Sequence, residues 1–353
     1  MAPMMWERFE ADFRDASVQS LATLLHPQSG ITSRVRELDI LESTLSVEGA
    51  DRAMLFIAAI PRDRLRRFES TWKVSALIFQ LEACIDQISF LKGLSSFYTS
   101  NVGKLEDLIV ILPMELTESE NTVQAIELLL KTCPKLSDLQ LDLSAHRLVA
   151  KHSVMAHHKT LESLMLGTAD SGSGRYYSAA DLNSILNGCT KLEALAIDMP
   201  PLDLGPISKP VTDFSSNEEY GHVLAAVSAP PALRVFRILN RPAFDIEEPL
   251  SDVPVNQAAV FCQVAMQNFA NHILRFVVDK GSNLQVLSIK PSEEADPAVY
   301  GTVVKDSNGH RWPEYNYIRG HTTDVTGTTT VVAHPSTNVV LDFPDLAEFM
   351  QYI

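Results

Sequence analysis

The apolar residues of this chain return in a fixed six-residue pattern: an apolar residue, two variable residues, an apolar residue, one variable residue and a third apolar residue. Full copies occupy 35–40, 105–110, 136–141, 161–166, 192–197, 233–238 and 284–289, and a weaker copy begins at Leu65. The alternation at the end of each copy is typical of a strand with one buried face. The pattern therefore predicts a series of short strands, one in each copy.

Between several of these strands the apolar residues change to a helical period. In TVQAIELLLK, at 122–131, apolar residues return every three or four positions and form one stripe. A second helix is predicted at 181–187, with Ser178 or Asp181 as its N-cap and Gly188 as its stop. A long amphipathic run follows at 260–276. Strand and helix thus alternate along the chain.

The apolar–x–x–apolar–x–apolar motif is that of the strand segment of a leucine-rich repeat. One such unit cannot bury its own apolar face, so neighbouring units must stack. The predicted fold is α/β: a leucine-rich-repeat solenoid, or horseshoe, with a parallel concave sheet and an irregular helical convex face. Motif spacing runs from 25 residues after Leu136 to 51 after Leu233, beyond the usual range of about 20–29. The array is therefore irregular, and its Pro-containing loops at 200–215 and 242–254 fit either a functional role or plain tolerance of insertions.

The pattern changes at both ends of the array. Residues 1–30 carry apolar residues at helical spacing and predict an N-terminal helical cap. The irregular repeats fill 31–291. Residues 292–353 predict a small β-rich C-terminal cap continuous with the array, with a hairpin at 301–312 and a closing helix at 346–352. Such caps shield the end faces of a stacked array from water.

The net charge limits the classes of partner, and the cysteine spacing indicates the cellular compartment. The chain has 29 Lys and Arg against 44 Asp and Glu, a net charge of −15, which opposes binding to nucleic acid or anionic membranes. Hydrophobic content of 46% indicates a globular protein, and no segment reaches the about 20 apolar residues of a membrane span. The four cysteines are widely spaced and form no C-x-x-C pair, which favours reduced thiols. We expect a cytoplasmic or nuclear protein, or one present in both compartments.

The sequence lacks the motifs of the common catalytic sites. It has no phosphate-binding glycine loop and no nucleophile elbow, and no carboxylate pair has a catalytic arrangement. His152, His157 and His158 would need a further carboxylate or Cys to bind metal, so a solvated loop or convex helix is favoured. Cys133 and Cys189 precede strands in similar phrases, which favours small buried residues at repeat corners over metal or redox chemistry. We therefore predict no catalytic residue, cofactor or metal site.

A candidate binding face follows from the strand period. Residues between the apolar positions of each strand are expected on the concave side of the sheet. The predicted protein-binding face consists of Glu37, Asp39, Arg67, Glu69, Asp107, Ile109, Asp138, Gln140, Asp142, Ser163, Met165, Asp198, Arg237, Ser288 and Lys290. Its early part is acidic, so we expect a protein partner with a basic segment near Asp107, Asp138 and Asp142. A surface that merely solvates the strands fits the same pattern.

Two parts of the chain carry a family resemblance. The phrases LLHP at 24–27 and RVRELDI at 34–40, with GHRWP at 309–313, YIRG at 317–320 and TDV at 323–325, resemble fungal F-box proteins. In those proteins the F-box binds the adaptor of a cullin–RING ubiquitin ligase, and the repeats that follow capture the protein to be ubiquitylated. The resemblance covers the repeat region only. We expect the F-box either to lie upstream of Met1 or to have been lost.

These observations favour one class of function. The chain is expected to be a protein–protein recognition module of leucine-rich-repeat type, and the resemblance implies substrate recognition for a cullin–RING ubiquitin ligase. A stand-alone scaffold unrelated to ubiquitin is the alternative. An enzyme with its site in the loops at 200–215 or 242–254 is the third, less favoured reading.

Overall fold

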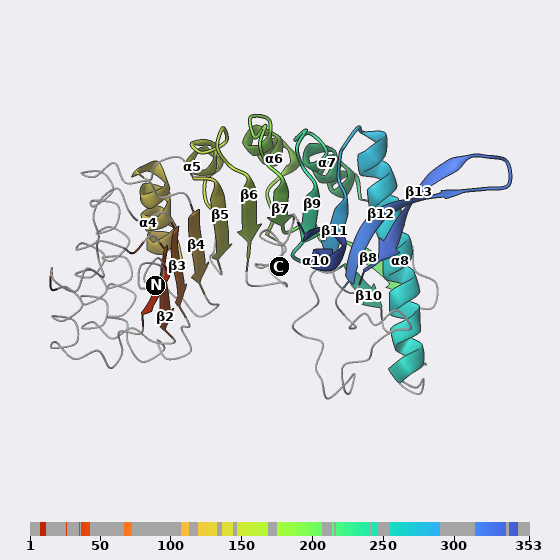
Figure 1. Ribbon diagram of the computed structural model, residues 1–353, viewed down its shortest axis with the longest axis horizontal. Helices are drawn as coiled ribbons and strands as arrows, with labels where there is room; N and C mark the ends of the chain where they lie inside the picture. The colour runs from red at the N-terminus through yellow and green to blue at the C-terminus, as the bar shows by residue number, and fades with distance from the viewer. Residues whose placement is uncertain are drawn as a thin grey trace, which may run out of the picture. The chain divides into compact units, whose positions relative to one another are not determined.

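A computed structural model describes the chain in two compact units, Met1–Asp170 and Ser171–Ile353 (Figure 1). The described residues are 8–11, 26, 35, 37–42, 67–72, 107–112, 119–132, 136–143, 147–168, 175–206, 214, 217–240, 242–245, 255–289, 315–336 and 339–344. Both units combine strands with helices, as the α/β prediction requires. The predicted division at 1–30, 31–291 and 292–353 stays a prediction.

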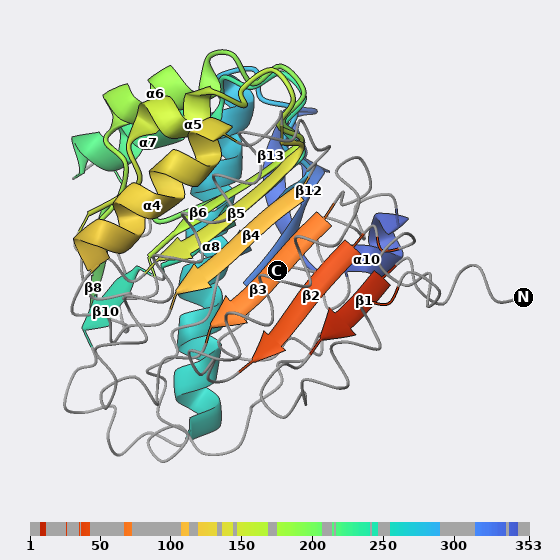
Figure 2. The same cartoon turned by 90° about the vertical axis from the view of Figure 1, so that its left-hand side faces the viewer.

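The first unit contains a parallel row of strands in chain order (Figure 2). The strands are β1 (Arg8–Ala11), β2 (Glu37–Glu42), β3 (Arg67–Trp72), β4 (Asp107–Leu112), β5 (Asp138–Leu143) and β6 (Ser163–Gly167). Strands β2 to β6 each begin at the third position of a predicted copy of the motif. The register aligns equal motif positions: the fourth position forms the row Leu38, Phe68, Leu108, Leu139 and Leu164. The strand predictions in this unit are confirmed.

Helices α4 (Ser119–Thr132) and α5 (Lys151–Met155) lie on one side of these strands (Figure 2). The predicted apolar stripe of α4 is buried: Val123, Ile126, Leu129 and Leu130 are at most 1% exposed. Burying side chains of this size contributes about 1.5–3 kcal/mol each. The amphipathic pattern thus decides which face of α4 packs inward.

A polar clamp ties α4 to the start of α5. Arg147 contacts Glu120 at 2.9 Å and Glu127 at 2.6 Å, and Glu127 also accepts a 2.8 Å hydrogen bond from the Ala150 N–H. Burial alone would raise the pKa of the Glu127 carboxyl, but the hydrogen bonds from Arg147 and Ala150 hold it below its ordinary value. The clamp therefore favours the charged form of Glu127 in the folded chain.

The second unit continues the motif with three parallel strands and adds an antiparallel hairpin. Strands β7 (Ala194–Ile197), β9 (Val235–Ile238) and β11 (Val286–Ile289) lie in that order, followed by β12 (Tyr315–Thr323) and β13 (Thr329–Pro335). Each of the parallel strands again begins at the third motif position. Their fourth positions, Leu195, Phe236 and Leu287, share one register. The strand predictions are confirmed here as well.

In the second unit one helix has its predicted N-cap, and a second helix has a cap that was not predicted. Helix α6 (Ala179–Leu186) begins at Ser178, whose Oγ accepts from the Asp181 N–H at 3.2 Å, and it ends before Gly188. In α7 (Glu218–Val227) the Asn217 side chain accepts from the Tyr220 N–H at 3.1 Å. Helix α8 (Val255–Asp279) is the long amphipathic run, and α10 (Val339–Asp342) is a single turn. None of the described helices has the length and apolar character needed to cross a membrane.

The two Pro-containing insertions meet, which the sequence did not indicate. Strand β8 (Asp203–Pro206) comes from the first insertion and β10 (Ala243–Asp245) from the second, and the two form a separate parallel pair. Gly205 has a φ of +68°, a value that glycine adopts without steric cost. The insertions therefore build a small structure of their own over the residues described.

The N-terminal end of the chain differs from its prediction, whereas the C-terminal region is β-rich as predicted. Residues Arg8–Ala11 form β1, paired in parallel with β2, where a helical cap was expected. The helix prediction is wrong over these residues because pairing with a neighbouring strand outweighs local helical spacing. The β-rich character predicted for residues 292–353 is confirmed over the described residues, where β12 and β13 form a hairpin. The hairpin predicted at 301–312 and the helix predicted at 346–352 lie outside the described residues.

Candidate functional site

In the first unit the strand register gathers the predicted binding residues into two rows. The third motif positions form the row Glu37, Arg67, Asp107, Asp138 and Ser163, and the fifth positions form the row Asp39, Glu69, Ile109, Gln140 and Met165. Asp142 lies two residues beyond Gln140 on the same strand, opposite Ile111. The sequence pattern thus placed neighbouring backbone positions correctly across five strands.

The described side chains of this face differ in how far they are exposed to solvent. Asp138, Asp142 and Met165 are half-buried. Gln140 and Ser163 are buried, at 6% and 8% exposure, so the expectation that they are open to a partner is wrong. Gln140 lies between Ile109 and Met165 of the adjacent strands, and Ser163 has a short side chain. The accessible part of the described face is therefore centred on Asp138, Asp142 and Met165.

In the second unit the predicted binding residues are buried. Asp198, Arg237 and Ser288 are 7%, 8% and 3% exposed, which contradicts their assignment to an open surface. Ser288 donates a 2.7 Å hydrogen bond to Asn316 of β12. Lys290 lies outside the described residues. These positions belong to the interior of the second unit.

The chain's own C-terminal segment covers part of the same face, at the third motif positions. Ala194, Val235 and Val286 form an apolar cluster with Val339 of α10, and Phe343 packs against it. Figures 1 and 2 show α10 across strands β7, β9 and β11 from helices α6 and α7. The face that the motif pattern assigned to a partner is thus filled here by apolar residues from later in the same chain.

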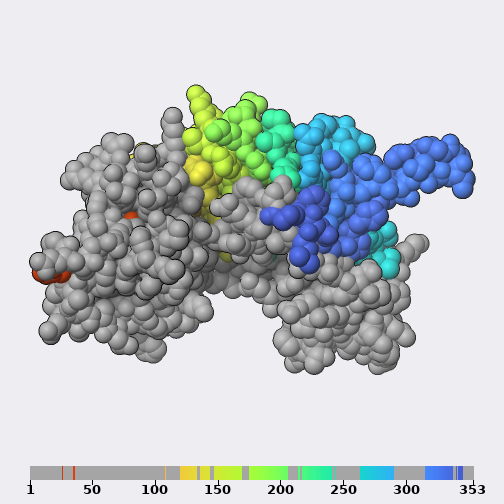
Figure 3. Space-filling view, viewed as in Figure 1, coloured from red at the N-terminus to blue at the C-terminus, as the bar shows by residue number. Residues whose placement is uncertain are grey.

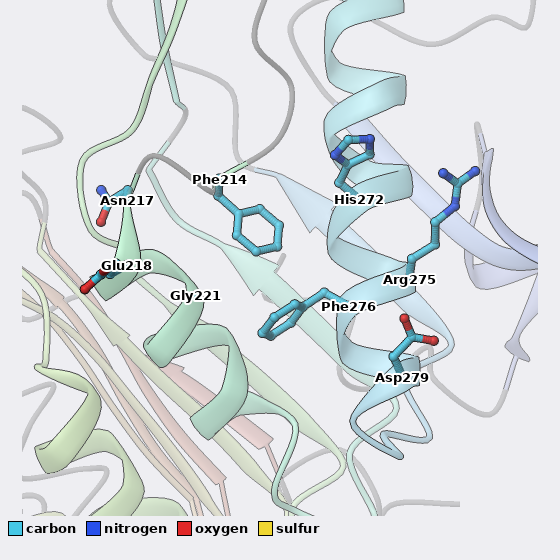
Figure 4. Close-up of a pocket in the computed structure, with 8 residues that line it drawn as sticks. All are labelled: Phe214, Asn217, Glu218, Gly221, His272, Arg275, Phe276 and Asp279. Atoms are coloured by element: carbon cyan, nitrogen blue, oxygen red, sulfur yellow. The ribbon is translucent and has the colours of Figure 1, made fainter.

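A groove of about 520 Å³ lies between α7 and α8 (Figure 4). Its walls carry the aromatic rings of Phe214 and Phe276, whose centroids are 5.3 Å apart in an edge-to-face arrangement. Gly221, in the middle of α7, leaves open space where a side chain would project. The volume is within the range of small-molecule sites, about 300–1,000 Å³. The groove can therefore take an apolar group of modest size.

The rim of the groove is charged. Glu218 comes from α7, and His272, Arg275 and Asp279 come from α8. Within the described part of the chain, no hydrogen bond or ion pair joins any two of these four side chains, and Arg275 instead donates through Nε to the Val331 carbonyl at 2.9 Å. General acid–base chemistry needs such groups within hydrogen-bond reach of each other or of the reacting atom. The four rim side chains therefore form no hydrogen-bonded acid–base pair in the described structure.

Sequence reasoning missed this groove for a physical reason. Along the chain, Phe214 is separated from α8 by α7, β9 and β10. The charged rim residues of α8 lie on the polar side of an amphipathic helix. Such residues read as ordinary solvated positions in the sequence. Only the packing of α7 against α8 brings them together with the two rings.

Tyr220 lies behind the wall of this groove. Its ring centroid is 5.6 Å from that of Phe214 and 6.0 Å from that of Phe269. Burial raises the pKa of the Tyr220 hydroxyl, and that hydroxyl has no hydrogen-bond partner among the described residues. A buried hydroxyl without a partner is destabilising. The Tyr220 ring thus supports the wall through its contacts with the two phenylalanine rings.

The histidine and cysteine predictions have clear outcomes. His157 is 2% exposed, not solvated: its Nδ1 accepts from the Leu136 N–H at 3.3 Å, and its Nε2 donates to the Leu130 carbonyl at 3.0 Å. It therefore joins the end of α4 to the start of β5.

Cys189 is buried, as predicted, and burial raises the pKa of its thiol to about 11. Cys133 lies outside the described residues.

Among the residues whose placement is described, no group of three or more His, Cys, Asp and Glu side chains could hold a metal ion. A comparison of the sequence with protein-family models gives no match, and a comparison with curated proteins gives none either. The resemblance to F-box proteins therefore stays a prediction.

Proposed function

We propose that the chain is a protein-recognition module of leucine-rich-repeat type, and that the sheet face of its first unit binds a basic segment of a partner protein. The observation that carries the proposal is the register of β4 and β5, which sets Asp107 directly beside Asp138. Neighbouring parallel strands are about 4.8 Å apart. Carboxylates at neighbouring strand positions give the face an acidic character that is complementary to a cationic segment.

Neighbouring residues extend this acidic position into a surface patch. Asp142 follows four residues after Asp138 on the same face of β5, and both are half-buried. Met165 of β6 lies beside Gln140 and is also half-buried. Flexible methionine side chains adapt well to varied partners. Carboxylates beside an adaptable apolar group fit a basic segment that also carries apolar residues.

A direct binding measurement tests the proposal. The probe is a fluorescent peptide of mixed Lys, Arg and Leu residues, titrated with the full chain and followed by anisotropy at several salt concentrations. The Asp142→Lys variant should weaken binding by about 5–30-fold, which corresponds to about 1–2 kcal/mol. The matched control is Glu162→Lys, which makes the same charge change at an exposed residue just before β6.

The two variants separate a site from general charge attraction. Because both change the net charge equally, a non-specific attraction of the peptide to an acidic protein should weaken equally in both. The proposal requires a loss confined to Asp142→Lys, with less than about a twofold change in Glu162→Lys. Equal losses, or no binding by the unmodified chain, would overturn it.

The resemblance to F-box proteins supports a narrower proposal about the partner. If the captured protein is a substrate for ubiquitylation, the natural full-length protein should co-purify with the adaptor of a cullin–RING ligase. Absence of the adaptor, with partner binding retained, would favour the stand-alone scaffold. The peptide measurement and the adaptor measurement can therefore fail independently.

A further inference from the structure

The hairpin of the second unit extends well beyond the strand that supports it. Strand β11 pairs with β12 only over 315–318, whereas pairing between β12 and β13 continues to Thr323 and Thr329. We call residues 320–332 the β-arm. Residues 321–329 are exposed, and Figures 1 and 3 show the β-arm standing clear of its unit. A two-stranded hairpin without further packing is only marginally stable in water.

One outer edge of this hairpin is closed by side chains of α8. Arg275 donates to the Val331 carbonyl at 2.9 Å, and Asn271 accepts from the Ala333 N–H at 2.7 Å. Gln267 donates to the Ala333 carbonyl. These three side chains follow one another at intervals of four along one stripe of the helix. They satisfy the backbone groups of β13 that would otherwise attract another strand.

The same bonds determine which groups the other edge presents. In an antiparallel hairpin, two residues that face each other either both bond within the hairpin or both point their backbone groups outward. Val331 and Ala333 point theirs outward, toward α8. The residues that face them, His321 and Arg319, therefore point theirs outward at the other edge, that of β12. Arg319 confirms this alternation of inward and outward residues, because its N–H points outward and donates to the Gln285 carbonyl at 2.8 Å. His321 and Thr323 lie farther along the same edge. Their outward N–H and C=O groups have no hydrogen-bond partner among the described residues.

The residues of this open edge favour pairing. Exposed edges are commonly protected by Lys or Pro, but 320–332 contains neither, and Asp324 in the turn is its only acidic residue. Asp324 is also engaged locally: its carboxylate accepts from the N–H groups of Thr326 and Thr328 at 2.8 and 2.9 Å. Threonine and valine, which predominate here, favour extended strands.

We infer that the open edge of β12 pairs with the same edge of a second copy of this chain, antiparallel and about a two-fold axis. A strand edge is complementary to itself under such an axis, which makes an isologous contact possible. Most of the chain should repel a second copy, because its net charge is −15. The β-arm holds little of that charge and stands clear of its unit, so two copies can meet there. This inference is independent of the proposed function.

Parity also fixes the register of the pair. With the axis at Thr322, His321 of each copy lies opposite Thr323 of the other, and each such pair can exchange two hydrogen bonds. An axis at His321 would instead require the Arg319 N–H, whose hydrogen bond the Gln285 carbonyl already accepts. An axis at Thr323 would require Val325, which lies in the turn of the hairpin. Thr322 should therefore face its own counterpart across the axis, in a non-hydrogen-bonded position.

A cysteine cross-link tests this register in the full chain. Facing residues at such a position have Cα atoms about 4.5 Å apart, within the about 4.4–6.8 Å that a disulfide spans. Thr322→Cys should form a covalent dimer under mild oxidation. The control is Thr330→Cys, whose residue lies beside Thr322 in the hairpin but on β13. Cross-linking of Thr322→Cys that does not exceed that of the control and the unmodified chain would overturn the inference.

A second measurement uses sedimentation velocity over a range of concentrations. The unmodified chain should show a reversible monomer–dimer equilibrium, and the double variant His321→Pro, Thr323→Pro should stay monomeric. Proline at these positions removes only outward N–H groups and leaves the hairpin bonds in place. Thr329→Pro, on the closed side of the arm, should still dimerise.

The remaining outcomes count against the second copy. A dimer that survives in the double proline variant would have to use another surface. An unmodified chain that stays monomeric, yet binds an added strand-forming peptide at β12, would assign the edge to a different protein. Either result overturns the inference.

Discussion

The two units share one strand motif but use the same side of the strands differently. At the fifth motif position, Met165 of the first unit is half-buried, whereas Arg237 and Ser288 of the second are buried. At the seventh position, Asp142 is half-buried and Asp198 is 7% exposed. On this side of the second unit, α10 also packs against the third motif positions of β7, β9 and β11. The motif sets strand position, and later parts of the chain decide whether a face remains accessible.

The largest expected effect comes from placing a charge in the second-unit cluster. Val339 is 4% exposed, so Val339→Asp should lower the free energy of unfolding by about 3–5 kcal/mol through an unpaired buried carboxylate. The matched control is Leu341→Asp, two residues along, where the side chain is 78% exposed and the expected change is within about 0.5 kcal/mol. Urea unfolding measures both. Similar losses in the two variants would mean that α10 does not cover the strands.

The same charge can be introduced at equivalent motif positions of the two units. Ser288→Asp should cost about 2–4 kcal/mol, because Ser288 is buried against Asn316. Met165→Asp should cost no more than about 1.5 kcal/mol, since a half-buried carboxylate keeps much of its hydration. Urea unfolding of both variants makes the comparison. Equal costs would remove the distinction between an open and a filled face.

The clamp at Glu127 should make stability depend on pH. The pKa of Glu127 is lower in the folded chain than in the unfolded chain, where it is about 4.3. The stability that its charged carboxylate contributes is therefore fully present above the unfolded pKa and is lost as the pH falls through the folded pKa. Glu127→Gln should therefore be less stable than the unmodified chain by about 1–2 kcal/mol at pH 7. The gap should narrow at pH 3. A gap that is equal at both values would show that the Glu127 charge is not responsible.

The smallest expected effect concerns the wall of the groove. Tyr220→Phe removes a buried hydroxyl that has no hydrogen-bond partner in the described part of the chain, so stability should rise by up to about 1 kcal/mol. Thermal unfolding of the two proteins measures the change. A loss of stability above about 1 kcal/mol would mean that the hydroxyl has a partner in solution.

Strand positions could be predicted from the sequence because the motif combines two independent signals. The period of two identifies a strand, and the recurrence of the same phrase implies equal register between neighbours. The row from Leu38 to Leu164 shows the result. The buried face of α4 and the N-cap at Ser178 could also be predicted, because both depend on residues close together in the sequence.

What covers each face could not be read in the same way. Val339 and Val286 are far apart in sequence, and no local pattern links one turn of helix to a particular strand. The pairing of β8 with β10 and the groove between α7 and α8 also depend on long-range packing. His157 was misread because a buried histidine that joins two backbone groups looks like a polar surface residue in sequence.

Hydrogen exchange with mass spectrometry tests the central claim most directly, because it reads both faces in one sample. The full chain would be compared with and without the basic peptide at saturating concentration. The account predicts slower exchange in peptides covering β5 and β6, and no change in those covering β7, β9 and β11, where α10 already occupies the face. Protection confined to the second unit, or none in β5 and β6 despite measurable binding, would contradict it.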